Sequence, residues 1–168
     1  MDIDNLIKEK GGIQLDIGCG VNKQDGFVGM DIRELPRVDI VWDFEEFPWP
    51  LPDECVLRAI ASHVVEHINP HKFGFIKWMD EAWRVMKPNG QLALALPYWL
   101  SGGYAQDPTH CNPCNEHTWA YFDPEVGDGV LYNIYKPKPW KLEYISWNPV
   151  ANMEVIMRKR LENGEAKD

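Results

Sequence analysis

The segment from Leu15 to Ile32, LDIGCGVNKQDGFVGMDI, places two apolar, strand-like runs unusually close together. The first run ends at a turn that contains Gly18 and Gly20, and the second run ends at Asp31. Glycine directly after a strand lets a ligand approach the backbone, because no Cβ stands in the way. An acid at the end of the next strand can hold ribose hydroxyls. The pattern predicts a nucleoside site, although a plain turn and an exposed strand-end acid are the alternative interpretation.

The link between the two runs narrows the choice of nucleoside. Only Val21 to Gly26 separate the glycine turn from the second run, which is too short for a crossover helix. A dinucleotide needs a helix N-terminus to hold its pyrophosphate. S-adenosylmethionine has a ribose and an adenine but no phosphate, so its binding does not require this helix. The spacing therefore favours S-adenosylmethionine and disfavours an NAD-dependent oxidoreductase.

The rest of the chain predicts a mixed α/β sheet. Continuous apolar runs indicate strands of a parallel sheet covered on both faces, namely Ile13–Ile17, Phe27–Ile32, Val38–Trp42, Leu57–Ala61 and Gln91–Pro97. Apolar residues at three- and four-residue spacing predict a helix over Phe75–Met86, which Lys87–Gly90 should end. Two later runs, Trp140–Trp147 and Met153–Leu161, predict an antiparallel hairpin joined by NPVAN.

We therefore expect a Rossmann-like three-layer α/β sandwich, formed as a single domain over residues 1–168. Its sheet should be mostly parallel and should end in an antiparallel hairpin, with the first crossover helix shortened or absent. The segment 98–139 is expected to be a substrate-side lid, because long loops over the carboxyl edge of a sheet often carry ligand contacts. Its many aromatic rings would either line a pocket or pack the lid.

Composition restricts the partners. The chain has 168 residues and a formal net charge of −9. Its one basic cluster, Met157–Arg160, is interpreted as an exposed strand end, so no nucleic-acid partner is expected. No apolar run is long enough to span a bilayer, and the first residues do not resemble a signal peptide, so a cytoplasmic protein without a membrane partner is expected. A small-molecule substrate suits this charge balance better.

Three motifs in order resemble one family. LDIGCG, DFEEFPWPLPDECVLRAIASHVVEHI and EAWRVMKPNGQLALALP resemble segments of class I S-adenosylmethionine-dependent methyltransferases of the small type 11 kind. The resemblance covers Leu15 to Pro97, about half of the chain. Two residues depart from the family pattern: Asn22 stands where a third glycine is common, and Leu57 stands where an acid is usual in the fourth strand.

The resemblance implies S-adenosylmethionine as the cofactor and assigns residues to its parts. Asp16 and the glycine turn would border the methionine half, and Asp31 would hold the ribose. Asp43 and Phe44 would border the adenine, while Ser62 and His63 would lie beneath the methionine and sulfonium. The predicted cofactor-binding residues are Asp16, Gly18, Cys19, Gly20, Asp31, Ile32, Asp43, Phe44, Ser62 and His63.

Methyl transfer from a sulfonium depends mostly on positioning, supplemented by a base where the acceptor carries a proton. His63, His67 and His110 are the catalytic candidates, and Glu66 and Tyr98 are further possible bases. The Glu66–His67 pair has packing and capping as its alternative role. The acceptor and the oligomeric state stay open, with a small-molecule acceptor favoured. The alternative function is a non-catalytic binding or regulatory module with the same fold.

The four cysteines do not form a disulfide framework in a chain of this kind. His110, Cys111, Cys114 and His117 in HCNPCNEH are all competent zinc ligands. The adjacent ligands His110 and Cys111 are sterically awkward, and the distant second pair of common zinc modules is absent. A loop with free thiols is favoured, and no metal is predicted.

Overall fold

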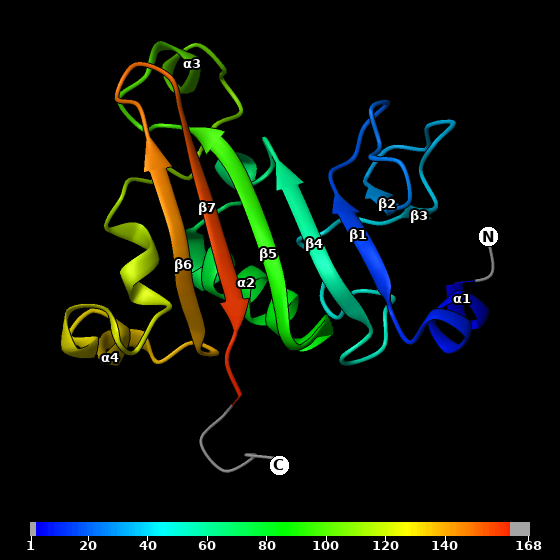
Figure 1. Cartoon of the computed structure of the whole chain (residues 1–168). Coiled ribbons are helices and arrows are strands. Elements are labelled where there is room, and N and C mark those ends of the chain that lie inside the picture. Colours follow the sequence, from blue (N-terminus) through cyan, green and yellow to red (C-terminus); the bar gives the residue numbers. More distant parts are fainter. Residues whose placement is uncertain (1–2, 162–168) are drawn as a thin grey trace.

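The computed structural model describes residues 3–161, which form one seven-stranded sheet in the order β3-β2-β1-β4-β5-β7-β6 (Figure 1). Strands β1 to β5 pair in parallel, whereas β7 is antiparallel to both β5 and β6. This arrangement confirms the predicted mostly parallel α/β sheet with a terminal hairpin. The strands are β1 (Ile13–Ile17), β2 (Val28–Asp31), β3 (Ile40–Val41), β4 (Val56–Ser62), β5 (Met86–Pro97), β6 (Trp140–Trp147) and β7 (Asn152–Lys159).

No helix lies between β1 and β2, as the short link predicted. The α-helices are α1 (Ile3–Lys10), α2 (Gly74–Val85), α3 (Gly102–Ala105) and α4 (Tyr132–Tyr135), and the 3₁₀ turns are η1 (Val65–His67), η2 (His71–Phe73), η3 (Thr118–Tyr121) and η4 (Val126–Gly129). The sequence interpretation missed α1, a short amphipathic helix with no buried residue. Within residues 3–161, no helix is long and apolar enough to cross a membrane.

Helix α2 supplies most of the helical contribution to the core. Phe75, Trp78, Met79 and Ala82 are buried along one of its faces, as the apolar spacing predicted. The helix ends at Val85, but the following Lys87–Gly90 segment is not a free turn. It lies inside the span of β5, where the pairing with β4 shifts register. The predicted start of that strand was therefore too late, because the register shift absorbs these residues within the ladder.

The two faces of the sheet are covered unequally. In β5, Leu92, Leu94 and Leu96 are buried, whereas the alternating Ala93 and Ala95 are only half-buried. Figure 1 shows α2 behind the sheet, with the front of β4, β5 and β7 bare. A hollow of about 410 Å³ lies over this second face. The second helical layer is sparse here because the links after β1 and β2 contain no helix.

The basic cluster Met157–Arg160 is not an exposed strand end, which corrects the sequence interpretation. Lys159 is buried, and its Nζ donates to the carbonyl oxygen of Met86 at 2.8 Å and pairs with Glu54. Its ammonium also lies 3.8 Å from the centroid of the Trp83 ring. Burial lowers the pKa of Lys159 and outweighs the opposing effect of Glu54. This lysine is part of the structural core.

Candidate functional site

The register of three parallel strands brings the predicted cofactor residues to one edge of the sheet. Ile17 of β1 pairs with Met30 of β2 and with Ala61 of β4. The next residues along these three strands, Gly18, Asp31 and Ser62, therefore lie at the same level. This is the carboxyl edge of the parallel strands, where open α/β sheets bind ligands.

The turn after β1 requires glycine at its first position. Gly18 has a φ of 66°, and a Cβ at this position would overlap Cγ2 of Val64. Gly20 has a φ of 53°, with its nearest neighbour, the Arg33 guanidinium, at ordinary contact distance. Backbone conformations of this kind favour glycine. The chain can therefore reverse direction here without a helix.

The N–H groups of this turn are already satisfied within the protein. Those of Gly18 and Cys19 both donate to the carbonyl oxygen of Met30, at 2.8 and 3.2 Å. The N–H of Gly20 donates to Oδ2 of Asp31 at 2.8 Å. Phosphate-binding turns instead direct their N–H groups at the ligand. The geometry favours a ligand without phosphates at this turn.

Two buried carboxylates flank the turn. Asp16 is 5% exposed, and burial raises its pKa, although its Oδ2 accepts a hydrogen bond from the N–H of Gln24 at 2.8 Å. Burial also opposes the charge of Asp31, but hydrogen bonds from Arg33 and Gly20 outweigh it and lower the pKa of this carboxyl. The lowered pKa keeps Asp31 negatively charged at neutral pH, whereas burial of Asp16 works against its charged form.

Asp31 has a larger structural role than the sequence suggested. It is 3% exposed, and its Oδ1 accepts hydrogen bonds from the N–H and the Nε of Arg33. With the Gly20 bond on Oδ2, about one of its roughly four acceptor positions is left for a ligand. The alternative interpretation of Asp31 as an exposed strand-end acid is therefore wrong.

The remaining predicted cofactor residues are placed around this edge. Ile32 and Ser62 are exposed, and Cys19, within the turn, is buried. Asp43 follows β3 and accepts the N–H of Glu45 at 2.9 Å, which caps a local turn. Phe44 is half-buried against the core, and its carbonyl oxygen accepts the indole N–H of Trp49.

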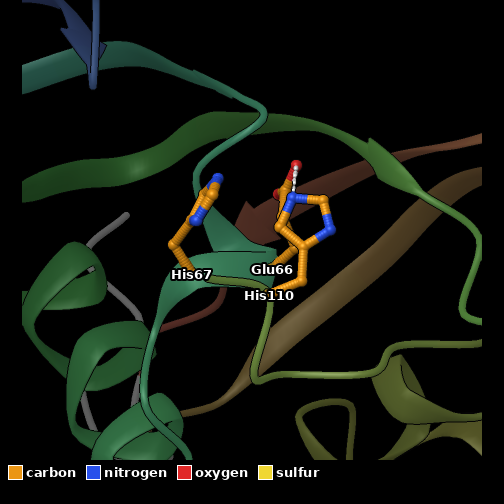
Figure 2. A group of neighbouring side chains, drawn as sticks. All are labelled: Glu66, His67 and His110. Carbon is orange, nitrogen blue, oxygen red and sulfur yellow. Dashed lines mark ion pairs between the residues drawn. The ribbon is translucent and has the colours of Figure 1, made fainter. Parts of the chain in front are cut away.

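The three catalytic candidates meet around Glu66. His63 and Glu66 come from the segment after β4, while His110 comes from the distant segment after β5. Nδ1 of His63 lies 3.0 Å from Oε1 of Glu66, and Nε2 of His110 lies 4.0 Å from the same oxygen. The rings of His67 and His110 meet edge to face with centroids 4.7 Å apart. Figure 2 shows Glu66, His67 and His110 side by side.

The motif HCNPCNEH is divided by the fold. Cys111 is exposed and lies against the carbonyl oxygen of His67, whereas Cys114 is fully buried. The side chain of His117 is 80% exposed and faces Glu116. Among the described residues, the structure gathers His110 with Glu66 and His67 rather than with these cysteines. All four cysteines are free.

The aromatic segment after β5 divides between the two roles that the sequence left open. Trp119 and Phe122 are buried and pack edge to face on Phe75 of α2. Tyr121 and Tyr135 instead line a hollow of about 390 Å³ beside this cluster. Tyr98 donates its hydroxyl to Glu116 at 2.8 Å, which raises the pKa of the phenol.

Comparisons with known proteins are informative at the level of structure. No family model and no curated protein matches the chain. A methyltransferase from Archaeoglobus fulgidus, described as S-adenosylmethionine-dependent, superimposes with a TM-score of 0.62. It has 20% identity, and the match covers 94% of this chain and 91% of the other. The fold is that of class I S-adenosylmethionine-dependent methyltransferases.

Other solved structures with this methyltransferase fold are named for different activities. The 1,6-didemethyltoxoflavin-N1-methyltransferase of Burkholderia thailandensis, solved with S-adenosylhomocysteine, has a TM-score of 0.55 and 15% identity over 94% of this chain and 76% of the other. The [4+2]-cyclase SpnF has a TM-score of 0.56 and 14% identity over 94% and 80%. The methyltransferase fold therefore does not by itself fix the reaction.

Proposed function

We propose that the protein is an S-adenosylmethionine-dependent methyltransferase that acts on a small molecule. One observation carries the proposal. The buried acids Asp16 and Asp31 flank a glycine turn in which the N–H groups of residues 18–20 each donate a hydrogen bond within the protein. Such an edge suits a cofactor with hydroxyls and positive charge but no phosphate.

The chemistry of these acids fits the cofactor. The remaining acceptor position on Asp31 suits a ribose hydroxyl, and the negative charge of Asp31 suits a ligand with a sulfonium and an ammonium group. Asp16 would border the methionine half of this cofactor. When bound, the cofactor supplies a methyl group on an activated sulfur. Asp43 and Phe44 would border the adenine, at the end of the neighbouring strand β3.

The residues of the chain would then position the acceptor and accept its proton. His63 is the nearest candidate to the cofactor residues, because it directly follows Ser62, and its Nδ1 is held by Glu66. That contact fixes the ring orientation while half of the side chain stays exposed. An imidazole positioned by a buried carboxylate is suited to general base catalysis. The segment 98–139 would form the acceptor side of the site.

Calorimetric titration with S-adenosylhomocysteine tests the cofactor assignment. We expect one molecule bound per chain, and the absence of binding at high ligand concentration would overturn the proposal. A panel of small acceptors, with release of S-adenosylhomocysteine as the readout, then tests methyl transfer. Activity that Asp31→Asn reduces and the surface variant Asp25→Asn leaves unchanged supports the enzyme.

The alternative is a non-catalytic module that binds the same cofactor. The structural similarity to SpnF supports this alternative, because SpnF has the same fold and is named for a reaction other than methyl transfer. Both functions predict cofactor binding, so only turnover separates them. Tight binding of S-adenosylhomocysteine without turnover of any acceptor would support the module.

A further inference from the structure

Glu66 is an unusual buried acid. Its side chain has no exposed surface, and its Oε1 is held by His63. Within residues 3–161, Oε2 has no hydrogen-bond partner. Burying a carboxylate oxygen without a partner is costly, so such an atom is well suited to bind a cation.

The ring of His110 is oriented to offer its other nitrogen to the same place. Its Nδ1 lies 2.9 Å from the carbonyl oxygen of Tyr104. A carbonyl oxygen only accepts, so Nδ1 carries the proton, and Nε2 of the neutral ring has a free lone pair. That Nε2 faces Glu66 and lies 3.8 Å from Oδ2 of Asp107. Metal-binding histidines commonly donate their second N–H to a carbonyl in this way.

His67 is held in the same tautomer by a second chain of hydrogen bonds. Its Nδ1 lies 3.0 Å from the hydroxyl of Thr109, and that hydroxyl donates to Oδ1 of Asp107 at 2.7 Å. The hydroxyl therefore accepts from Nδ1–H of His67. This arrangement leaves Nε2 of the neutral His67 ring with its lone pair free. Two imidazoles and one carboxylate therefore lie close together, with Nε2 of each ring free of a hydrogen bond to the backbone.

We propose that Glu66, His67 and His110 bind one divalent transition-metal cation. One ligand atom from each residue lies within 4.8 Å of the other two. Ligand atoms on a zinc ion are roughly 3.4 Å apart, so small side-chain rotations close the site. Two imidazoles with one carboxylate suit Zn²⁺, Fe²⁺ or Co²⁺. No metal was predicted from the sequence, because His110 was considered there only as a ligand together with the nearby Cys111, Cys114 and His117.

The backbone holds the two parts of this metal site together. The N–H groups of Cys111 and Asn112 both donate to the carbonyl oxygen of Glu66, at 2.9 and 3.0 Å. The side chain of Asn112 also donates to the carbonyl oxygen of Val65. The loop that carries His110 is thus fixed to the turn η1 that carries Glu66 and His67. A rigid arrangement of this kind lowers the cost of binding an ion.

The metal site also suggests a class of acceptor, a step that rests on the proposed function. Glu66 is within hydrogen-bond distance of His63, which follows the predicted cofactor residue Ser62. Three protein ligands leave coordination positions for an acceptor. An acceptor with oxygen donors, such as a pair of adjacent hydroxyls, would bind the cation on the side of the predicted cofactor residue Ser62.

Cobalt titration of the full chain, after chelator treatment and dialysis, tests the metal site. We expect one Co²⁺ per chain, with visible absorption bands from nitrogen and oxygen ligands. His110→Asn and His67→Asn should each weaken Co²⁺ binding by about tenfold to a hundredfold or more. His117→Asn is the matched control, because its side chain is exposed outside the cluster and should bind Co²⁺ like the wild type.

The outcomes separate this proposal from the proposed function. Wild-type protein that binds S-adenosylhomocysteine but no Co²⁺ or Zn²⁺ overturns the metal site alone. An equal loss of Co²⁺ affinity in His67→Asn and His117→Asn also overturns the metal site, because the ion would then bind at the surface. Cobalt binding that the cluster variants abolish supports the site even if S-adenosylhomocysteine does not bind. His67 is partly exposed, so its variant is expected to fold even where Glu66→Gln does not.

Discussion

The carboxylate of Asp31 accepts the N–H of Gly20 at 2.8 Å, and this bond joins the end of β2 to the turn after β1. The same carboxylate is the predicted ribose ligand. The carboxylate of Asp31 therefore serves both the fold and the predicted binding of the ribose. A test of binding must keep the size of the side chain, for which Asp31→Asn is better suited than Asp31→Ala.

Asp31→Asn should weaken the binding of S-adenosylhomocysteine by about tenfold to a hundredfold, because one charge-assisted hydrogen bond is lost. Calorimetry with the purified variant measures this change. The control Asp25→Asn alters an exposed acid, whose side chain is 96% exposed, and should bind like the wild type. Binding by Asp31→Asn at wild-type affinity, in a folded protein, would show that the ribose lies elsewhere.

Asp43→Ala should weaken cofactor binding less than Asp31→Asn. Asp43 lies at a partly exposed turn that it caps through the N–H of Glu45, whereas Asp31 is buried. A hydrogen bond to an exposed group contributes less, since water competes for it. The ratio of the two dissociation constants, measured under the same conditions, checks the order. A larger loss for Asp43→Ala would contradict it.

Asp31 should also make the fold sensitive to acid. Its pKa is lowered in the folded protein, so its contribution to stability is present above about pH 4 and is lost as the pH falls through the folded pKa. The raised pKa of Asp16 has the opposite effect on the pH dependence of stability. The contribution of Asp31 is therefore isolated by comparing the wild type with Asp31→Asn. Urea unfolding between about pH 3 and pH 6 should show a smaller acid loss in Asp31→Asn than in the wild type. If the free energy of unfolding falls equally with pH in the two proteins, Asp31 does not contribute to the acid sensitivity.

Gly18→Ala should destabilise the fold more than Gly11→Ala. Both glycines have a positive φ, which costs alanine about 1–2 kcal/mol. Only at Gly18 does the added methyl group overlap Val64, whereas no atom lies within 4 Å at Gly11. Denaturant unfolding of both variants measures the difference. In a Val64→Ala background, the excess cost of Gly18→Ala should disappear, and its persistence would refute the steric explanation.

Lys159→Met should destabilise the protein by about 1–3 kcal/mol, because it leaves the buried carbonyl oxygen of Met86 without this donor and removes the cation over Trp83. Lys141→Met, at an exposed position of β6, is the control and should change the free energy of unfolding by less than about 0.5 kcal/mol. Equal effects of the two substitutions would show that the buried ammonium contributes nothing specific.

Much of the sheet could be predicted from local patterns. The runs Ile13–Ile17 and Trp140–Trp147 match β1 and β6 at both ends, because apolar runs between turn residues have few other solutions. Helix α2 was predicted within one residue at each end from its apolar spacing. The start of β5 was not predicted, since a register shift inside a strand depends on its partner.

The sequence by itself determined the glycine turn, the order of the strands along the chain and the absence of a first crossover helix, because each depends on residues close together in the chain. Only the tertiary structure decided what surrounds Glu66. His110 reaches this acid because the loop after β5 returns to η1 and donates two backbone hydrogen bonds to the carbonyl oxygen of Glu66. The tertiary structure also decided that Lys159 is buried, since its burial depends on the carbonyl oxygen of Met86 in β5 and on the ring of Trp83 in α2.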